Sequence, residues 1–173
     1  HPTHAWLTAI SPAHMEGMKN LAVVRAEKEK LLEVASESCL REEDLFDQGL
    51  AHWQSETPGK WLVWLESVGD LELPVLAMHE ASLATSAAWF AHLLGVHAAV
   101  IKGRAAQLHP APGRLNLHRW GGWRILDDSY NASPASMVAA FEVLKGLDGK
   151  RKVGILGTMH EMGDNEEKYH REV

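Results

Sequence analysis

Residues 125–137, with the sequence ILDDSYNASPASM, constrain the fold of this chain more than any other stretch. The stretch begins as an apolar strand and becomes polar abruptly at Asp127 and Asp128. A short loop follows, and Ser133 and Pro134 then predict the start of a helix, because serine is a favoured N-cap and proline suits the first helical position. Open α/β sheets bind ligands where a strand leads through such a loop into a helix.

The two aspartates have more than one chemical interpretation. Adjacent carboxylates at a strand end are costly to bury without partners. They can accept hydrogen bonds from ligand hydroxyls or face a metal ion, or they can simply cap local turns. Their spacing alone does not decide between these roles.

Composition narrows the class of protein. Of the 173 residues, 46% are hydrophobic and 23% are charged, as in an ordinary soluble globular protein. The net charge of −6 and the lack of a basic block argue against nucleic-acid binding. The single cysteine, Cys39, excludes an internal disulfide framework, and no apolar run is long enough to cross a membrane. The chain begins at His1 and ends inside a predicted helix, so we expect an excerpt of a longer protein.

Hydrophobic periodicity predicts alternating strands and helices in the first part of the chain. We expect, in order, a strand at 5–10, helices at 21–34 and 43–53, strands at 60–66 and ending within 73–76, and helices at 81–94 and 97–108. The sequence HPAPG at 109–113 then interrupts regular structure, because proline lacks a donor and glycine frees the backbone. We therefore expect a boundary between domains at 1–112 and 113–173.

The second part of the chain predicts a hairpin followed by a β–α–β unit. The hairpin comprises 115–120 and 123–127, with Gly121 and Gly122 in the turn. A helix over 134–147 and a buried strand over 152–156 complete the unit, and a further helix begins at 165. This order predicts a parallel strand pair with a right-handed crossover, as in a Rossmann-like domain.

Four motifs resemble those of the Mur ligases, ATP-dependent enzymes that form amide bonds in peptidoglycan synthesis. They are SPAHMEGM at 11–18, DDSYNASPASM at 127–137, ILGTMHEMG at 155–163 and YHREV at 169–173. The resemblance covers the chain except residues 36–70. It implies an α/β fold, with the end of a P-loop-type ATPase domain followed by the start of a Rossmann-like C-terminal domain. The G-K-[ST] phosphate loop is absent from this sequence, and the resemblance implies that it lies upstream.

The resemblance implies a magnesium site that involves His14 and Lys28. The histidine would help to place Mg²⁺ near the terminal phosphate, and a carbamylated lysine would hold a second Mg²⁺, because this ion prefers oxygen ligands. A lone histidine is more commonly structural, and most charges on the helix at 21–34 fit a solvated face. Ala9 and Lys30 stand where the family usually has Asn and Glu, which leaves the details of the metal site open.

Four residues near the domain boundary are implied to bind ATP. The Arg114 side chain would reach the phosphates, since its planar, permanently charged fork suits phosphate oxygens, although a lone arginine after glycine is usually a surface charge. Asp128 would accept a hydrogen bond from the ribose. Tyr130 and Asn131 would line the same loop and shape the nucleotide pocket.

Weaker assignments come from two other segments. His79 corresponds to a residue beside the adenine in the family, but Glu80 replaces the usual Asn, and a simple helix-start histidine is equally consistent with the sequence. The loop at 157–163 is implied to face the incoming peptide substrate. Glu161 and His170 belong either to that face or to the solvated surface.

Within the family, the motifs most resemble the members that add D-alanyl-D-alanine to UDP-N-acetylmuramoyl-tripeptide. The full protein is then expected to be a cytoplasmic bacterial enzyme, monomeric, with no nucleic-acid partner and no membrane insertion. This chain alone, without the phosphate loop, is expected to be inactive. A related Mur or folylpolyglutamate-type ligase with another amine substrate is less consistent with DDSYNASP, because those enzymes more often carry His in this loop. Ala9 and Lys30 keep a non-catalytic scaffold derived from a ligase as a third hypothesis.

Overall fold

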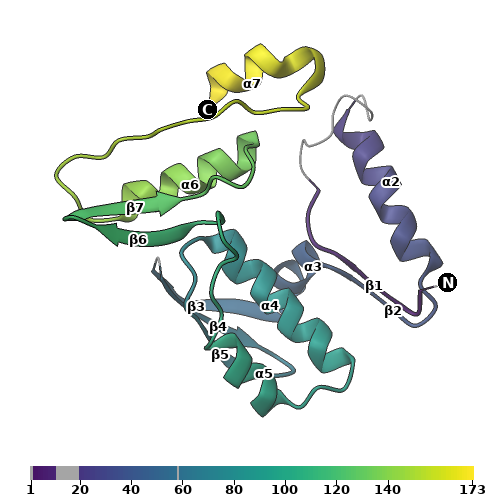
Figure 1. The fold of residues 1–173 in the computed structure, drawn as a ribbon. Coiled ribbons are helices and arrows are strands. Elements are labelled where there is room, and N and C mark those ends of the chain that lie inside the picture. Colours follow the sequence, from purple (N-terminus) through teal and green to yellow (C-terminus); the bar gives the residue numbers. More distant parts are fainter. Residues whose placement is uncertain (1, 11–19, 58) are drawn as a thin grey trace. The chain divides into compact units, whose positions relative to one another are not determined.

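The structure is a computed structural model, which describes residues 2–10, 20–57 and 59–173 (Figure 1). The chain divides into two compact units. The first unit comprises residues 1–10 and 25–109, and the second comprises residues 11–24 and 110–173.

The first unit contains two sheets. Strand β1 (His4–Leu7) pairs in parallel with β2 (Ser38–Arg41), and helix α2 (Leu21–Val34) lies between them in the sequence. Strands β3 (Ala51–Thr57), β4 (Lys60–Leu65) and β5 (Gly69–Leu73) form an antiparallel meander in sequence order.

Helices cover one face of the meander and create the main core. These helices are α4 (Met78–Leu93) and α5 (Ala98–Ala105), and α3 (Glu42–Asp47) packs against α4 and β3. Successive side chains of a strand point to opposite faces, so burial alternates along β4, where Trp61, Val63 and Leu65 are buried and the residues between them are half-buried. Leu71 and Leu73 of β5 continue the same buried layer.

The second unit contains a hairpin and two helices. Strands β6 (Asn116–Trp120) and β7 (Trp123–Asp127) pair antiparallel through the predicted glycine turn, in which Gly121 and Gly122 have φ values of +51° and +86°. Helix α6 (Pro134–Gly146) begins at the predicted N-cap Ser133, whose hydroxyl accepts a hydrogen bond from the Ser136 amide. A 3₁₀ turn, η1 (Gly163–Asn165), leads into α7 (Glu166–Glu172).

Most of the predicted elements are confirmed. The helix predicted at 21–34 has these bounds, and the hairpin and the helices near 81–94, 97–108 and 134–147 form within a few residues of their predicted ends. The strand at 60–66 forms as β4. The helix suggested at 43–53 is only partly correct, because α3 ends at Asp47 and β3 begins at Ala51, after a turn at Gly49 with φ of +73°.

The strand predicted at 152–156 is wrong, and so is its parallel pairing. In the part of the chain that the structure describes, these residues form no regular element, and β7 pairs with β6 alone. Ile155 is 97% exposed and Leu156 is 60% exposed. An apolar run becomes a strand only where a neighbouring strand takes up its backbone hydrogen bonds, and no described strand lies in that position.

Candidate functional site

In the second unit, the linker before β6 and the loop after β7 are joined by hydrogen bonds that backbone amides donate. The Tyr130 amide donates to the Gly113 carbonyl oxygen at 3.1 Å. The Leu115 amide donates to Oδ1 of Asp128 at 3.2 Å. Residues separated by more than a dozen positions are therefore held in a fixed register at one end of the hairpin.

The linker reaches this register through two left-handed residues. Gly113 has a φ of +72°, and a Cβ atom added there would lie 3.2 Å from the Tyr130 amide nitrogen, so this position favours glycine on two grounds. Leu115 has a φ of +49°, which costs a non-glycine residue about 1–2 kcal/mol. Its side chain is only 3% exposed, and this burial offsets the backbone cost.

Arg114 lies between these two residues in the sequence. Its side chain stacks on the ring of Tyr130, in the loop after β7. Its guanidinium carbon is 4.1 Å from the centroid of the Tyr130 ring, which is the geometry of a cation–π contact. Such contacts contribute about 0.5–1 kcal/mol at exposed positions, and both side chains are exposed here. The guanidinium is therefore positioned by the ring while it remains accessible to an anionic ligand.

The two aspartates of the loop have different environments. Asp127 accepts a hydrogen bond from the Ser129 amide at 3.1 Å. Hydrogen bonds from the Ser129 hydroxyl and amide, with a smaller contribution from His118, lower the pKa of Asp127 because they stabilise the carboxylate. Asp128 is half-buried, and within the described residues its hydrogen bonding involves Oδ1 only. Asp127 therefore caps a local turn, whereas Asp128 keeps Oδ2 available for a ligand.

Asn131 follows Tyr130 in this loop and is exposed. No described contact joins its side chain to Arg114 or Asp128, so the structure brings together three of the four residues near the domain boundary that are predicted to bind the nucleotide.

The predicted metal ligands lie elsewhere in the chain. His14 falls outside the described residues. Lys28 is on α2, and its ammonium nitrogen donates to the Ala9 carbonyl oxygen at 2.8 Å. Among the residues that the structure describes, no three or more His, Cys, Asp or Glu side chains are grouped as metal ligands.

His79 is exposed in the first turn of α4. Its neighbour Glu80 folds back over the helix start, where Oε2 accepts hydrogen bonds from the amides of Leu76 at 3.2 Å and Ala77 at 3.1 Å. A carboxylate in this position satisfies free amides and interacts favourably with the helix dipole. The replacement of the usual Asn by Glu80 therefore has a local capping role.

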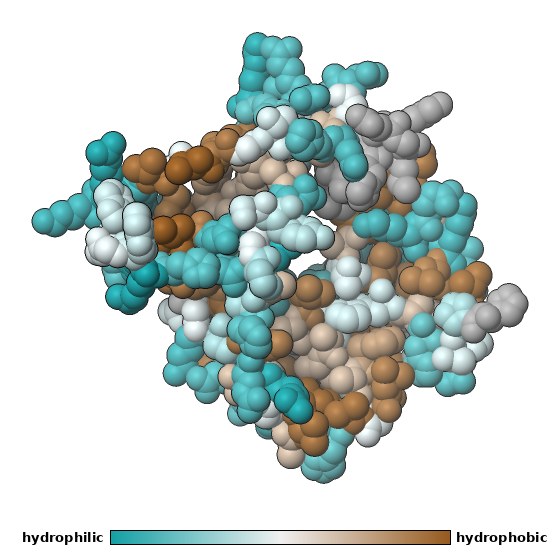
Figure 2. Space-filling model, in the orientation of Figure 1, coloured by the Kyte–Doolittle hydropathy of each residue, from teal (hydrophilic) through white to brown (hydrophobic). Residues whose placement is uncertain are grey.

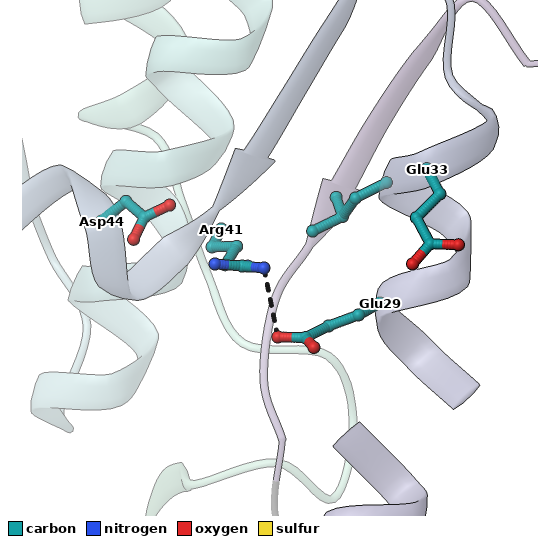
Figure 3. A pocket seen from close by; sticks show the side chains of 5 residues that line it. Glu29, Glu33, Arg41 and Asp44 are labelled. Carbon is teal, nitrogen blue, oxygen red and sulfur yellow. Dashed lines mark ion pairs between the residues drawn. The ribbon is translucent and has the colours of Figure 1, made fainter. Parts of the chain in front are cut away.

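A depression in the first unit is lined by none of the predicted site residues. Its lining is mostly charged and comes from α2, β2 and α3: Glu29, Leu32, Glu33, Arg41 and Asp44 (Figure 3). Figure 3 shows the Arg41 guanidinium pointing toward Glu29, and the two form an ion pair at 3.2 Å.

Comparison with known proteins shows similarity to one family. Residues 113–173 match the sequence profile of the Mur ligase, glutamate ligase domain. The UDP-N-acetylmuramoyl-tripeptide–D-alanyl-D-alanine ligase of Haemophilus influenzae is 28% identical over 197 residues, covering 99% of this chain and 43% of that protein. The enzyme of the same name from Escherichia coli is 28% identical over 202 residues, covering 99% of this chain and 44% of that protein. The chain is thus similar to Mur ligases along nearly its whole length, and residues 113–173 match the profile of one of their domains.

Solved structures confirm the α/β fold of this chain. A crystal structure of MurF from Acinetobacter baumannii superposes with a TM-score of 0.87 at 24% identity, covering 99% of this chain and 43% of that chain. MurF ligase from Thermotoga maritima, in complex with ADP, superposes with a TM-score of 0.82 at 21% identity. The match covers 99% of this chain and 45% of that chain. The chain thus spans less than half the length of the relatives that it matches.

The profile-matched part of this chain contains Arg114, Asp128, Tyr130 and Asn131. Two residues that bond to this cluster were not singled out from the sequence, Asn116 and Ser129. Asn116 is the first residue of a strand that follows a proline- and glycine-containing linker, and an amide side chain in that position is a recognisable signal for a turn-closing contact.

Proposed function

We propose that this chain is part of an ATP-dependent ligase that joins D-alanyl-D-alanine to UDP-N-acetylmuramoyl-tripeptide in peptidoglycan biosynthesis. The observation that carries the proposal is that relatives with this name align with 99% of the chain, on both sides of Pro110. We assign residues 1–112 to the end of the central ATP-binding domain and residues 113–173 to the start of the C-terminal ligase domain.

The proposed reaction has two chemical steps. A carboxylate oxygen of the tripeptide attacks the γ-phosphorus of ATP, so the bond to ADP breaks and an acyl phosphate forms. The amine of D-alanyl-D-alanine then attacks the acyl carbon, and the tetrahedral intermediate expels inorganic phosphate as the amide forms and the amine loses a proton. Negative charge collects on the phosphoryl oxygens during transfer, so positioned cations accelerate the first step.

The linker and loop of the second unit supply groups suited to the nucleotide. Arg114 presents an accessible guanidinium, which can bind two phosphate oxygens at once. Oδ2 of Asp128 is suited to accept a hydrogen bond from a ribose hydroxyl, since Oδ1 is occupied by the Leu115 amide. Tyr130 supports the guanidinium through its ring, and Asn131 extends the same exposed loop. We assign a weak adenine contact to His79.

Magnesium enters the proposal only through a modified Lys28. In its ordinary state the Lys28 ammonium is a cation that donates to the Ala9 carbonyl, so it does not fit a Mg²⁺ ligand. A carbamate on this nitrogen would carry a negative charge and two oxygen ligands. We therefore propose that Lys28 is carbamylated in the enzyme and acts together with His14.

The Lys28 proposal can be tested in the full-length protein that contains this chain. Lys28→Ala is expected to lower turnover about 100-fold, with partial rescue by a short carboxylic acid such as acetate. Lys60→Ala is the control, because Lys60 is an exposed lysine of β4 that pairs with Glu72 at the surface and has no proposed role in the metal site. Carbon-13 NMR with labelled bicarbonate should show a carbamate signal that Lys28→Ala lacks. Unchanged turnover in Lys28→Ala would exclude the role.

The cellular setting follows from the proposed substrates. ATP and a UDP-linked muramoyl tripeptide are water-soluble, so we propose a cytoplasmic enzyme that acts as a monomer. No helix within the described ranges has the length and apolar character needed to span a membrane.

The deciding experiment measures phosphate release by the full-length protein with ATP, Mg²⁺ and UDP-N-acetylmuramoyl-tripeptide, with and without D-alanyl-D-alanine. We expect release that depends on the dipeptide. Release that requires a different amine would retain the ligase chemistry and change the substrate. If no amine supports release, the non-catalytic scaffold becomes the better interpretation.

A further inference from the structure

The side chain of Asn116 closes the linker before β6. Its Oδ1 atom accepts a hydrogen bond from the Arg114 amide at 3.2 Å, and its Nδ2 atom donates to the Pro110 carbonyl oxygen at 3.3 Å. The residue is half-buried. One amide side chain therefore ties both ends of the segment from Pro110 to Arg114.

The backbone amides of Arg114 and Leu115 therefore donate to different side chains. The Arg114 amide points to Asn116 and also donates to the Ala111 carbonyl oxygen at 3.0 Å, which closes a turn. The Leu115 amide points to Asp128. Because these two amides are adjacent, the hydrogen bond made by Asn116 fixes the backbone of Arg114 relative to the Asp128 carboxylate.

We propose that Asn116 is a positioning residue that holds Arg114 in register with Asp128 and with the Tyr130 ring. The inference rests on the proposed role of Arg114 in binding the phosphates of ATP. An arginine side chain has several rotatable bonds, and ordering it opposes binding. Fixing its backbone in the free protein reduces that cost, because fewer bonds remain to be ordered when the nucleotide binds.

The left-handed conformation of Leu115 makes this support necessary. A leucine with a φ of +49° gains free energy by returning to an extended conformation unless other contacts oppose the change. Asn116 follows it directly and anchors the preceding turn through Pro110. Loss of the Asn116 side chain should therefore allow the linker to relax and move Arg114 away from the Tyr130 ring.

The test uses variants of the full-length protein. Asn116→Ala removes both hydrogen bonds and is expected to lower kcat/KM for ATP about tenfold, while KM for D-alanyl-D-alanine stays within twofold. Asn116→Asp keeps the acceptor for the Arg114 amide and removes the donor to Pro110, so we expect an intermediate loss of about threefold. In the Arg114→Ala background, Asn116→Ala should add less than a twofold loss, because a residue that acts through Arg114 has no further effect once that side chain is absent.

Asn165→Ala is the matched control in the same unit, since Asn165 is exposed and makes no side-chain cap at the start of α7. A second readout does not depend on catalysis. Hydrogen exchange of the Arg114 and Leu115 amides should accelerate at least tenfold in Asn116→Ala and remain unchanged in Asn165→Ala.

The possible outcomes separate this inference from the proposed function. Unchanged exchange at Arg114 and Leu115 in Asn116→Ala would overturn the inference even in an active ligase. So would a tenfold loss that persists undiminished in the Arg114→Ala background, because it would indicate a general structural role. If the wild-type protein lacks ligase activity but the exchange prediction holds, the proposed function fails and the contact made by Asn116 stands.

Discussion

The two units of the chain achieve order in different ways. In the first, the meander of β3, β4 and β5 packs against α4 and α5, and Leu65 and Leu73 are fully buried. In the second, β6 and β7 form a two-stranded hairpin whose Trp120 and Trp123 are 73% and 61% exposed. Figure 2 shows hydrophobic side chains at the surface of both units, but a multi-stranded buried layer lies in the first alone among the described residues.

This difference matters because the residues proposed to bind the nucleotide lie in the less buried unit. Side chains that must meet a ligand cannot all be fixed by apolar packing, since packing would cover them. In the second unit, hydrogen bonds fix the linker and the loop instead of apolar packing. They join the Leu115 amide to Asp128, the Ser129 amide to Asp127, and the Asn116 side chain to its two backbone partners. We therefore expect core mutations to affect the first unit most and polar mutations to affect the second most.

The largest expected effect is on the buried meander. Leu65→Ala in β4 removes a side chain with 0% exposure and should lower the free energy of unfolding by about 3 kcal/mol. The same change at Leu117 in β6, which is 38% exposed, should cost less than about 1 kcal/mol. Urea unfolding of the full-length variants, followed by tryptophan fluorescence, measures both. Equal losses would mean that the hairpin is buried in the complete protein as deeply as the meander.

The sequence predicted elements well where periodicity and end signals agreed. The apolar positions of α2 repeat at helical spacing, and Ser133 with Pro134 marks the start of α6, so both helices were placed correctly. In α2, however, Val24 is buried whereas Leu21 and Leu31 are each 43% exposed. The segment at 152–156 was misassigned, because an apolar run alone cannot report whether a neighbouring strand is present. The sequence also singled out Arg114, Asp128 and Tyr130, which the structure brings together, while their role in binding a nucleotide stays a prediction. Asp128 was singled out for a ligand, and local turn capping was one of the roles considered for the aspartates. Which aspartate caps the turn depends on which backbone amides the folded chain presents.

The second-largest effect is expected on kcat/KM for ATP, in variants of the exposed residues Arg114 and Tyr130. Arg114→Ala should lower kcat/KM for ATP by about 10- to 100-fold, or about 1.4–2.7 kcal/mol, because it removes a bidentate phosphate contact. Arg114→Lys should restore little of this, since an ammonium lacks the planar fork. Tyr130→Phe keeps the ring, so its kcat/KM for ATP should stay within twofold of wild type. Tyr130→Leu removes the ring and should lower kcat/KM for ATP about threefold. Steady-state kinetics at varied ATP measures all four, and equal activity of Arg114→Lys and wild type would contradict the bidentate contact.

A smaller effect is expected at helix α6. Ser133→Ala removes the hydroxyl that accepts the Ser136 amide and should lower the free energy of unfolding by about 1 kcal/mol. Ser67→Ala in the first unit is the opposite case, because the Ser67 hydroxyl is buried with no hydrogen-bond partner among the described residues. Ser67→Ala should therefore leave the free energy of unfolding unchanged or raise it slightly. Thermal unfolding of the two variants measures the difference, and an equal loss at both positions would show that the Ser133 cap contributes nothing specific.

The smallest effects should have opposite signs with pH in the two units. Burial raises the pKa of Glu42 in α3 above its usual 4.5, partly countered by a hydrogen bond from Ser82. Its contribution to stability is therefore full below pH 4.5 and is lost as pH rises through the raised pKa, so Glu42→Gln should be slightly more stable than wild type at pH 7.

The pKa of Asp127 is lowered below 3.8 by Ser129, so its contribution is present above pH 3.8 and is lost as pH falls through the lower pKa. Asp127→Asn should then be less stable than wild type at pH 7, and the difference should shrink in acid. Urea midpoints from pH 7 to pH 3 measure both trends. Trends of the same sign would contradict the contrast between a desolvated carboxyl in the first unit and a carboxylate stabilised by hydrogen bonds in the second.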